Sequence, residues 1–227
     1  MNAVKSIFLK QVADFNKNYS VSLMFILFPA LAFIMSRFMG GEEGAVQIIM
    51  FAAMFVAGTP MTAISTTVAE DVEHKSLRFL VMAGVKPAQY LLGITLFVLA
   101  LSALGLSFFA FMADLSGEMM LHFFALAMMG CFSSAFLGAG IGLFANNVQQ
   151  ASLIQTPVMM VLAFTPMLSM FNETLARIAE YIFVYQIFQA FLNPDADMTR
   201  AYIIVAANAL ALLGFFAAAY KKKGLRG

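Results

Sequence analysis

Few residues of this chain are of the types that perform chemistry, and they are scattered. The two histidines, His74 and His122, lie far apart in the sequence, and we expect neither to be a metal ligand or a proton relay. The single cysteine, Cys131, lies within an apolar run, where packing is its expected role. No Cys and His cluster indicates a metal site, and no histidine or acid is placed to activate a serine or threonine. These residues argue against an enzyme.

Hydroxyl side chains gather around Pro60 within an apolar run. A proline in a membrane helix frees a carbonyl group, which neighbouring hydroxyls can satisfy. Two interpretations are open: the hydroxyls line a translocation path, or they stabilise a kinked helix. The residues concerned are Thr59, Thr62, Ser65, Thr66 and Thr67.

A charged segment, 70–86, interrupts the apolar sequence. It begins with acids, which suit a helix N-terminus, and Gly84 can end that helix before Pro87 begins the next one. The acids are Glu70, Asp71 and Glu73, and the apolar face is formed by Leu77, Leu80 and Val81. A short amphipathic helix at a membrane boundary would suit the docking of a soluble partner. The alternative is a simple interfacial connector.

The composition places the elements around these residues in a membrane. Hydrophobic residues make up 62% of the chain and charged residues 11%, against roughly 45–50% and about 25% in soluble domains. A bilayer core of about 30 Å requires roughly 20 apolar residues per helix. We therefore predict an all-α integral membrane protein, a single domain over 1–227 with six transmembrane helices. The predicted spans are 20–38, 45–69, 88–113, 119–144, 151–171 and 201–220.

The distribution of basic residues predicts the orientation. All but three of the 13 lysines and arginines fall on one side of a six-span chain, the exceptions being Arg37, Arg177 and Arg200. Because basic residues are retained in the cytoplasm, both termini and the 70–86 segment are expected to be cytoplasmic.

The two remaining segments predict further helices. In 1–19, apolar residues recur at helical spacing opposite lysines, which predicts an interfacial helix on anionic lipid, with a disordered leader as the alternative. In 172–200, an apolar stretch is short and contains Glu180. We expect helices there that re-enter, or lie on, the outer leaflet.

Small residues recur at every fourth position of the fourth predicted span. They are Gly130, Ser134, Gly138 and Gly142. Such a ridge lets helices approach closely, either within the chain or in a dimer contact.

The predicted spans contain essentially no charged residue, although ion-driven carriers normally need an intramembrane carboxylate. This disfavours a proton- or sodium-coupled carrier. The chain also lacks a G-x-x-x-x-G-K-[ST] phosphate loop. A separate partner would have to supply ATP hydrolysis if this protein transports anything.

The segment 70–93 resembles the loop between the second and third spans of ABC-2 type permeases, the membrane subunits of bacterial ABC exporters. The matching elements are the acids, Ser76-Leu77, Phe79-Leu80 and Leu91-Leu92-Gly93. The departures are Lys75 for the usual glycine, Arg78 for the usual acid, Ile94 for the usual lysine and the displaced Pro87. The interfacial helix, the six spans and the long outer segment before the last span are also similar to this family.

The resemblance implies a permease subunit that moves a hydrophobic or amphipathic substrate, such as a peptide, drug or lipid, out through a bacterial plasma membrane. It implies two ATPase subunits, which bind ATP and Mg, and a second permease subunit, identical or similar; no cofactor, catalytic residue, metal ligand or nucleic-acid partner is expected for this chain. The implied coupling helix, around 70–83, includes Glu70, Asp71, Glu73, Ser76, Leu77 and Leu80. The implied translocation path, between permeases and involving the second and fifth spans, includes Thr59, Thr62, Thr66, Thr156 and Met160.

The alternative function is that of a non-transporting membrane protein: a scaffold, a sensor or an immunity component. A neighbouring gene for a soluble Walker-type ATPase would favour the exporter.

Overall fold

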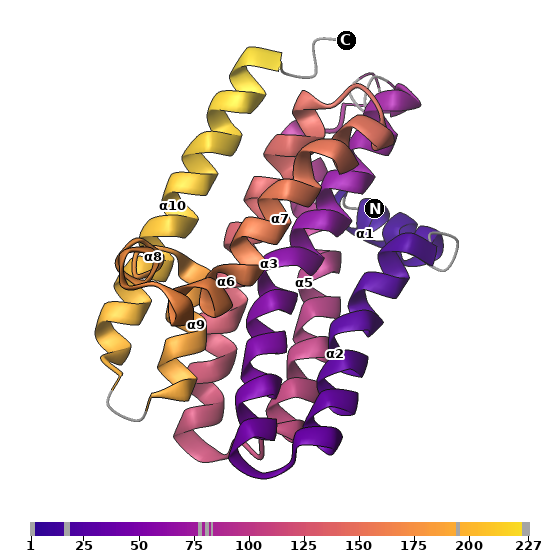
Figure 1. Cartoon of the computed structure of the whole chain (residues 1–227). Coiled ribbons are helices and arrows are strands. Elements are labelled where there is room, and N and C mark those ends of the chain that lie inside the picture. Colours follow the sequence, from indigo (N-terminus) through magenta and orange to yellow (C-terminus); the bar gives the residue numbers. More distant parts are fainter. Residues whose placement is uncertain are drawn as a thin grey trace.

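The six predicted spans are present as long helices. The computed structural model describes residues 3–15, 19–76, 79, 82, 84–193 and 196–223, which are helical apart from short turns (Figure 1). Six helices are long and apolar enough to cross a bilayer, which confirms the predicted all-α membrane fold. They are α2 (Tyr19–Met39), α3 (Gly41–Glu73), α5 (Pro87–Met112), α6 (Gly117–Phe144), α7 (Val148–Phe171) and α10 (Met198–Lys223).

The helix predicted near the N-terminus is α1 (Ala3–Phe15), which runs across the long helices (Figure 1). Its buried Ile7 rests on Gly93 of α5, where an added Cβ atom would lie only 2.7 Å from Ile7 Cγ2. Glycine is therefore needed at position 93 for α1 to approach α5 this closely. Lys10 of α1 contacts α3 and is described below.

α3 is the central helix of the bundle, and its closest neighbour is α6. Pro60 lies inside α3 and has no N–H to donate to the carbonyl oxygen of Val56, four residues earlier. The buried hydroxyl of Ser134, on α6, donates to that oxygen at 2.6 Å. A hydroxyl does satisfy the carbonyl freed by Pro60, but it belongs to Ser134 of a neighbouring helix and not to the residues expected around Pro60.

The ridge of small residues on α6 faces α3 and α9 inside the subunit. An added Cβ atom at Gly138 would lie 2.3 Å from the carbonyl oxygen of Met61, and one at Gly142 would lie 2.8 Å from that of Ser65. At Gly130 the nearest atoms belong to the side chains of Ile187 and Val56. Of the two interpretations of the ridge, the structure shows packing within the chain, which allows backbone-to-backbone contact between α6 and α3.

Two short helices precede α10 where the sequence predicts the outer segment. α8 (Glu173–Ala179) is seen nearly end-on in Figure 1 and therefore crosses the bundle, whereas α9 (Phe183–Leu192) runs along it. α9 packs against α3, α6 and α10, with Phe183 and Phe188 fully buried. The prediction of short helices instead of a seventh span is confirmed, and α9 is part of the core.

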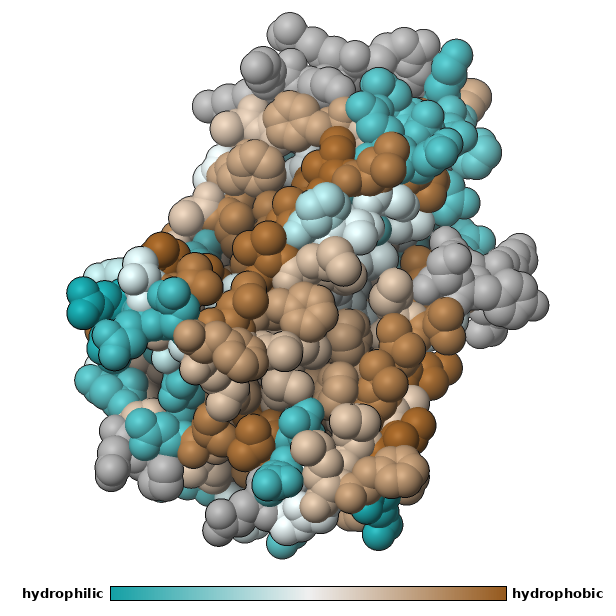
Figure 2. All heavy atoms as spheres, in the orientation of Figure 1, coloured by the Kyte–Doolittle hydropathy of each residue, from teal (hydrophilic) through white to brown (hydrophobic). Residues whose placement is uncertain are grey.

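Much of the remaining surface is apolar. Figure 2 shows hydrophobic side chains over most of one face, with polar residues near the end of the bundle where α7 begins and around α8. Most residues of α2, α7 and α10 lie outside the protein core. These helices therefore present apolar faces to lipid or to other membrane subunits.

The bond between Ser134 and Val56 makes a prediction about stability. Replacing Ser134 by alanine leaves the carbonyl oxygen of Val56 without a donor in a buried interface, a loss of about 1–3 kcal/mol. We expect S134A to lower the melting temperature of the detergent-purified protein by several degrees, because about 1 kcal/mol corresponds to about 2–4 °C for a domain of this size.

The adjacent Ser133 provides the matched control. It is equally buried, but it donates within its own helix to the carbonyl oxygen of Met129, at 3.1 Å, so S133A should have little effect. In a P60A background the missing N–H is restored, and S134A should then lower the melting temperature only slightly. If S134A lowered the melting temperature equally in the wild-type and P60A backgrounds, the bond from Ser134 to the Val56 carbonyl would not be the cause of the loss.

Candidate functional site at the end of the central helix

Three helices are joined by one buried carboxylate near the end of α3. Asp71 is only 4% exposed. Its Oδ1 accepts a hydrogen bond from Lys10 Nζ of α1 at 3.1 Å, in an ion pair, and its Oδ2 accepts one from the hydroxyl of Tyr90 of α5 at 2.5 Å. A buried carboxylate requires such partners, so Asp71 fixes α1 and α5 to α3. This end of the bundle, where α3 ends and α5 and α7 begin, is called the Asp71 end.

The acids of the 70–86 segment lie on α3 itself, which differs from the predicted position at the start of a separate helix. α3 continues through Glu73, and the chain then turns at His74 and Lys75, whose φ angle is 56°. The helix continues past the apolar run because Asp71 has partners on two other helices. Asp71 is therefore not on a docking surface, whereas Glu70 is exposed.

Glu73 joins α3 to α7. Its Oε2 accepts a hydrogen bond of 3.0 Å from the backbone N–H of Val148, the first residue of α7. A carboxylate at this position satisfies a free N–H and interacts favourably with the helix dipole. The side chain of Asn147 caps the same helix by accepting from the N–H of Gln150 at 2.7 Å. The acids at the end of α3 thus fix the start of α7 as well as α1 and α5.

The chain beyond α3 presents large apolar side chains outward. Ser76, Phe79 and Met82 have helical backbones. Phe79 is 66% exposed and Met82 is 74% exposed. Leu77 and Leu80, the predicted apolar coupling residues, lie outside the described residues. Exposed Phe and Met side chains are suited to packing against another protein.

A cavity of about 560 Å³ lies between α1, α2, α3 and α5 at the Asp71 end. Its charged lining consists of Lys10, Asp14, Glu70 and Asp71, beside His74 and Ser76. Among the described residues, no group of three or more His, Cys, Asp and Glu could hold a metal ion. The cavity is a polar hollow built around the Asp71 cluster.

A second hollow of about 440 Å³ lies between α2, α3 and α7. Thr62, Thr66 and Thr156, three of the predicted path residues, line it together. The other two lie elsewhere: Thr59 is fully buried and donates to the carbonyl oxygen of Met24 at 3.3 Å, and Met160 is exposed on α7. The structure thus brings three of the four threonines predicted for the path to one site inside a single chain.

Sequence reasoning missed two residues of this end, Tyr90 and Gln155. Tyr90 lies 19 positions after Asp71, and only the fold shows that they meet. Gln155 is a buried amide that lines the second hollow. An amide within an apolar run, directly before Thr156, is the signal that could have identified it.

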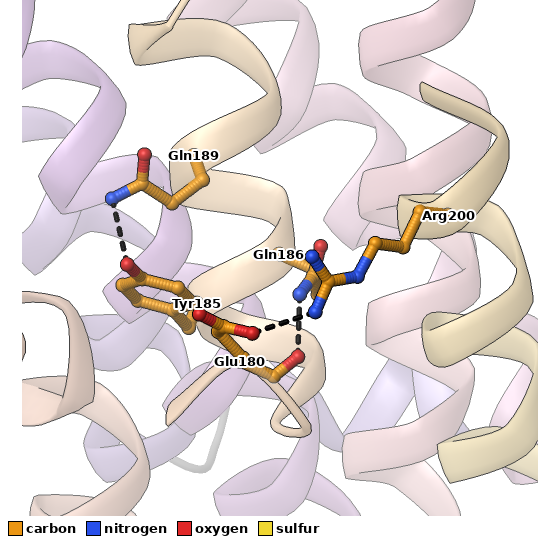
Figure 3. Close-up of polar contacts among 5 residues, drawn as sticks. All are labelled: Glu180, Tyr185, Gln186, Gln189 and Arg200. Carbon is orange, nitrogen blue, oxygen red and sulfur yellow. Dashed lines mark hydrogen bonds and ion pairs between the residues drawn. The ribbon is translucent and has the colours of Figure 1, made fainter. Parts of the chain in front are cut away.

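A separate polar cluster holds α8 and α9 to α10 (Figure 3). Arg200 of α10 forms an ion pair of 2.6 Å with Glu180, and the side-chain amide of Gln186 donates to the backbone carbonyl oxygen of Glu180. Asn208 of α10 donates to the carbonyl oxygen of Tyr181 at 2.9 Å. Two backbone carbonyls where α8 ends thus receive side-chain donors, which an apolar environment requires. The outer segment is therefore fixed in place by specific polar contacts.

Comparison with known proteins identifies a matching family. The profile of a family described as "ABC-2 family transporter protein" matches residues 4–220, nearly the whole chain. No curated protein matches the chain.

The Asp71 cluster makes a second prediction about stability. Replacing Tyr90 by phenylalanine keeps the ring but removes one of the two donors to a buried carboxylate, a loss of about 1–3 kcal/mol. We expect Y90F to lower the melting temperature in detergent by several degrees. The control is Y181F, because Tyr181 is exposed on the linker between α8 and α9 and should tolerate the change. Identical melting of Y90F and the wild type would show that the bond to Asp71 does not hold α5 to α3.

Proposed function

Because the chain belongs to the ABC-2 family of transporter proteins, we propose that it is the permease subunit of an ATP-binding cassette exporter. It is a multi-pass membrane protein and a transporter component. The proposed activity is the outward movement of a hydrophobic or amphipathic substrate, such as a peptide, drug or lipid. ATP and Mg are bound by a separate ATPase subunit.

One observation carries the proposal: exposed Phe79 and Met82 directly follow a helix end that is bonded to three other helices. Asp71 holds α1 and α5, and Glu73 holds α7. A force applied by a partner at the exposed residues would therefore reach most of the bundle through polar contacts. This is the requirement for a coupling segment, to which Glu70 and Ser76 also belong.

The proposed assembly contains two ATPase subunits and two permeases, the second permease being identical or similar to this chain. The apolar faces of α2, α7 and α10 are available for lipid and for the second permease. The hydroxyl-lined hollow between α2, α3 and α7 is the proposed start of the substrate path. We place the Asp71 end and both termini in the cytoplasm of a bacterial cell, because the lysines and arginines gather there.

The coupling proposal predicts a specific loss of assembly. A charge at an apolar protein contact is left without a partner, so F79D and M82D should each abolish co-purification of the ATPase from native membranes. Membrane insertion and melting temperature should stay unchanged, because both side chains are exposed. The control is F38D, at the opposite end of the bundle, where Phe38 is also exposed. A wild-type permease that captures no ATPase would favour the non-transporting alternative.

The orientation predicts which cysteines react with an impermeant reagent. Native Cys131 is fully buried, so the wild-type chain should not be labelled. In intact cells K75C should be protected and R177C should react, because Lys75 follows α3 and Arg177 lies on α8. In inside-out vesicles the result should reverse: K75C should react directly, and R177C should react only after permeabilisation. Labelling of K75C in intact cells would overturn the orientation.

A further inference from the structure

The hollow between α2, α3 and α7 contains one polar atom that the fold does not use. Gln155 is only 5% exposed, and its Oε1 accepts no hydrogen bond from the described residues. Leaving a buried amide oxygen without a donor is unfavourable, because the oxygen loses its hydrogen bonds to water. A side chain that destabilises the empty protein and lines a hollow indicates a ligand that supplies the missing donor.

Two of the four hydroxyl groups that line the hollow have already used their protons. Thr156 donates to the carbonyl oxygen of Ser152 at 2.7 Å, and Thr62 donates to the sulfur of Met159 at 3.8 Å. What these two hydroxyls retain is lone pairs. Together with the unsatisfied amide oxygen of Gln155, these two hydroxyls form a group of three hydrogen-bond acceptors in the hollow, which favours a ligand with several donors.

The charge of the hollow favours a cation. Glu70 lines the hollow, is exposed, and forms none of the ion pairs found among the described residues. His74 also lines the hollow, and no lysine or arginine of the described part of the chain does. A positively charged group would gain one carboxylate partner without displacing another.

An apolar surface continues from the hollow along α7. Thr156, Met160 and Phe164 follow at intervals of four residues and so lie on one helix face. Met160 and Phe164 are both exposed. A ligand with its polar group among the acceptors could place an apolar chain along this face, within the membrane.

We propose that this hollow binds the protonated amine of a cationic amphiphile, with the N–H groups donating to Gln155 and the two threonines and the charge facing Glu70. The proposal rests on the proposed function, since it names the class of molecule that enters the exporter. Quaternary ammonium groups carry the same charge without N–H donors and are expected to bind less well.

The test measures binding of radiolabelled dodecylamine to the purified full chain in nanodiscs of neutral lipid. Empty nanodiscs measure how much dodecylamine enters the lipid alone. Dodecyltrimethylammonium and dodecanoate serve as competitors. Because a hydrogen bond to a charged group contributes about 1.5–3 kcal/mol, Q155L should weaken dodecylamine binding roughly tenfold or more. Q155L should leave the binding of dodecyltrimethylammonium unchanged. E70Q should weaken the binding of both dodecylamine and dodecyltrimethylammonium.

Stability separates loss of the site from loss of the fold. Q155L removes an unsatisfied buried polar atom, so its melting temperature should equal or exceed that of the wild type. The matched control is Q47L, near the opposite end of α3, which should bind dodecylamine as the wild type does. E43Q serves as the same control for E70Q.

The outcomes separate this inference from the exporter assignment, because amine binding requires no ATPase. Unchanged dodecylamine binding by Q155L, or competition by dodecyltrimethylammonium equal to that by unlabelled dodecylamine, would overturn the inference even if an ATPase co-purifies. Selective amine binding in a chain that captures no ATPase would support the site and contradict the exporter.

Discussion

The missing N–H of Pro60 would leave the Val56 carbonyl oxygen unsatisfied in the interior of a membrane bundle, and Ser134 of α6 supplies the donor. Around this bond, glycines allow the backbones of α6 and α3 to touch, as at Gly138 and Met61. The other helices pack against the pair: α2, α5 and α7 contact α3, and α10 contacts α6. The unpaired Val56 carbonyl thus receives a hydrogen bond only when α6 packs against α3 in the register that places Ser134 beside it. The contact between the two helices is therefore specific as well as close.

The fold was largely predictable from the sequence because the bilayer imposes a length and a polarity on every span. The six long helices begin and end within a few residues of the predicted runs. The main difference is at Asp71, which looked like an exposed acid and is buried. Its partners, Lys10 and Tyr90, come from helices before and after it, so no local pattern reveals them. Asn208 is a similar case, because the carbonyl that needs it belongs to the linker between α8 and α9.

Polar contacts are rare in this protein, and they are concentrated where helices must stay in fixed relation. The Asp71 cluster joins the beginning of the chain to α3 and α5, and the Glu180 cluster joins α8 and α9 to α10. Between these clusters the contacts are mainly apolar, with single polar contacts such as Ser134 to Val56 and Thr59 to Met24. Gln155 departs from this arrangement, because its amide oxygen has no structural partner. The buried hydroxyl oxygen of Ser65 also has no partner among the described residues, but Gln155 is the one of the two that lines a hollow.

The length of α3 has a mechanical consequence. With 33 residues it is about 50 Å long, whereas the apolar part of a bilayer is about 30 Å thick. Its backbone contact with α6, from Val56 to Ser65, lies near its midpoint, so a rigid-body tilt of α3 around this contact would move its two ends in opposite directions. A tilt of about 10° would move each end by about 4 Å for a helix of this length. Pressure at the Asp71 end would then displace the Gly40 turn at the far end.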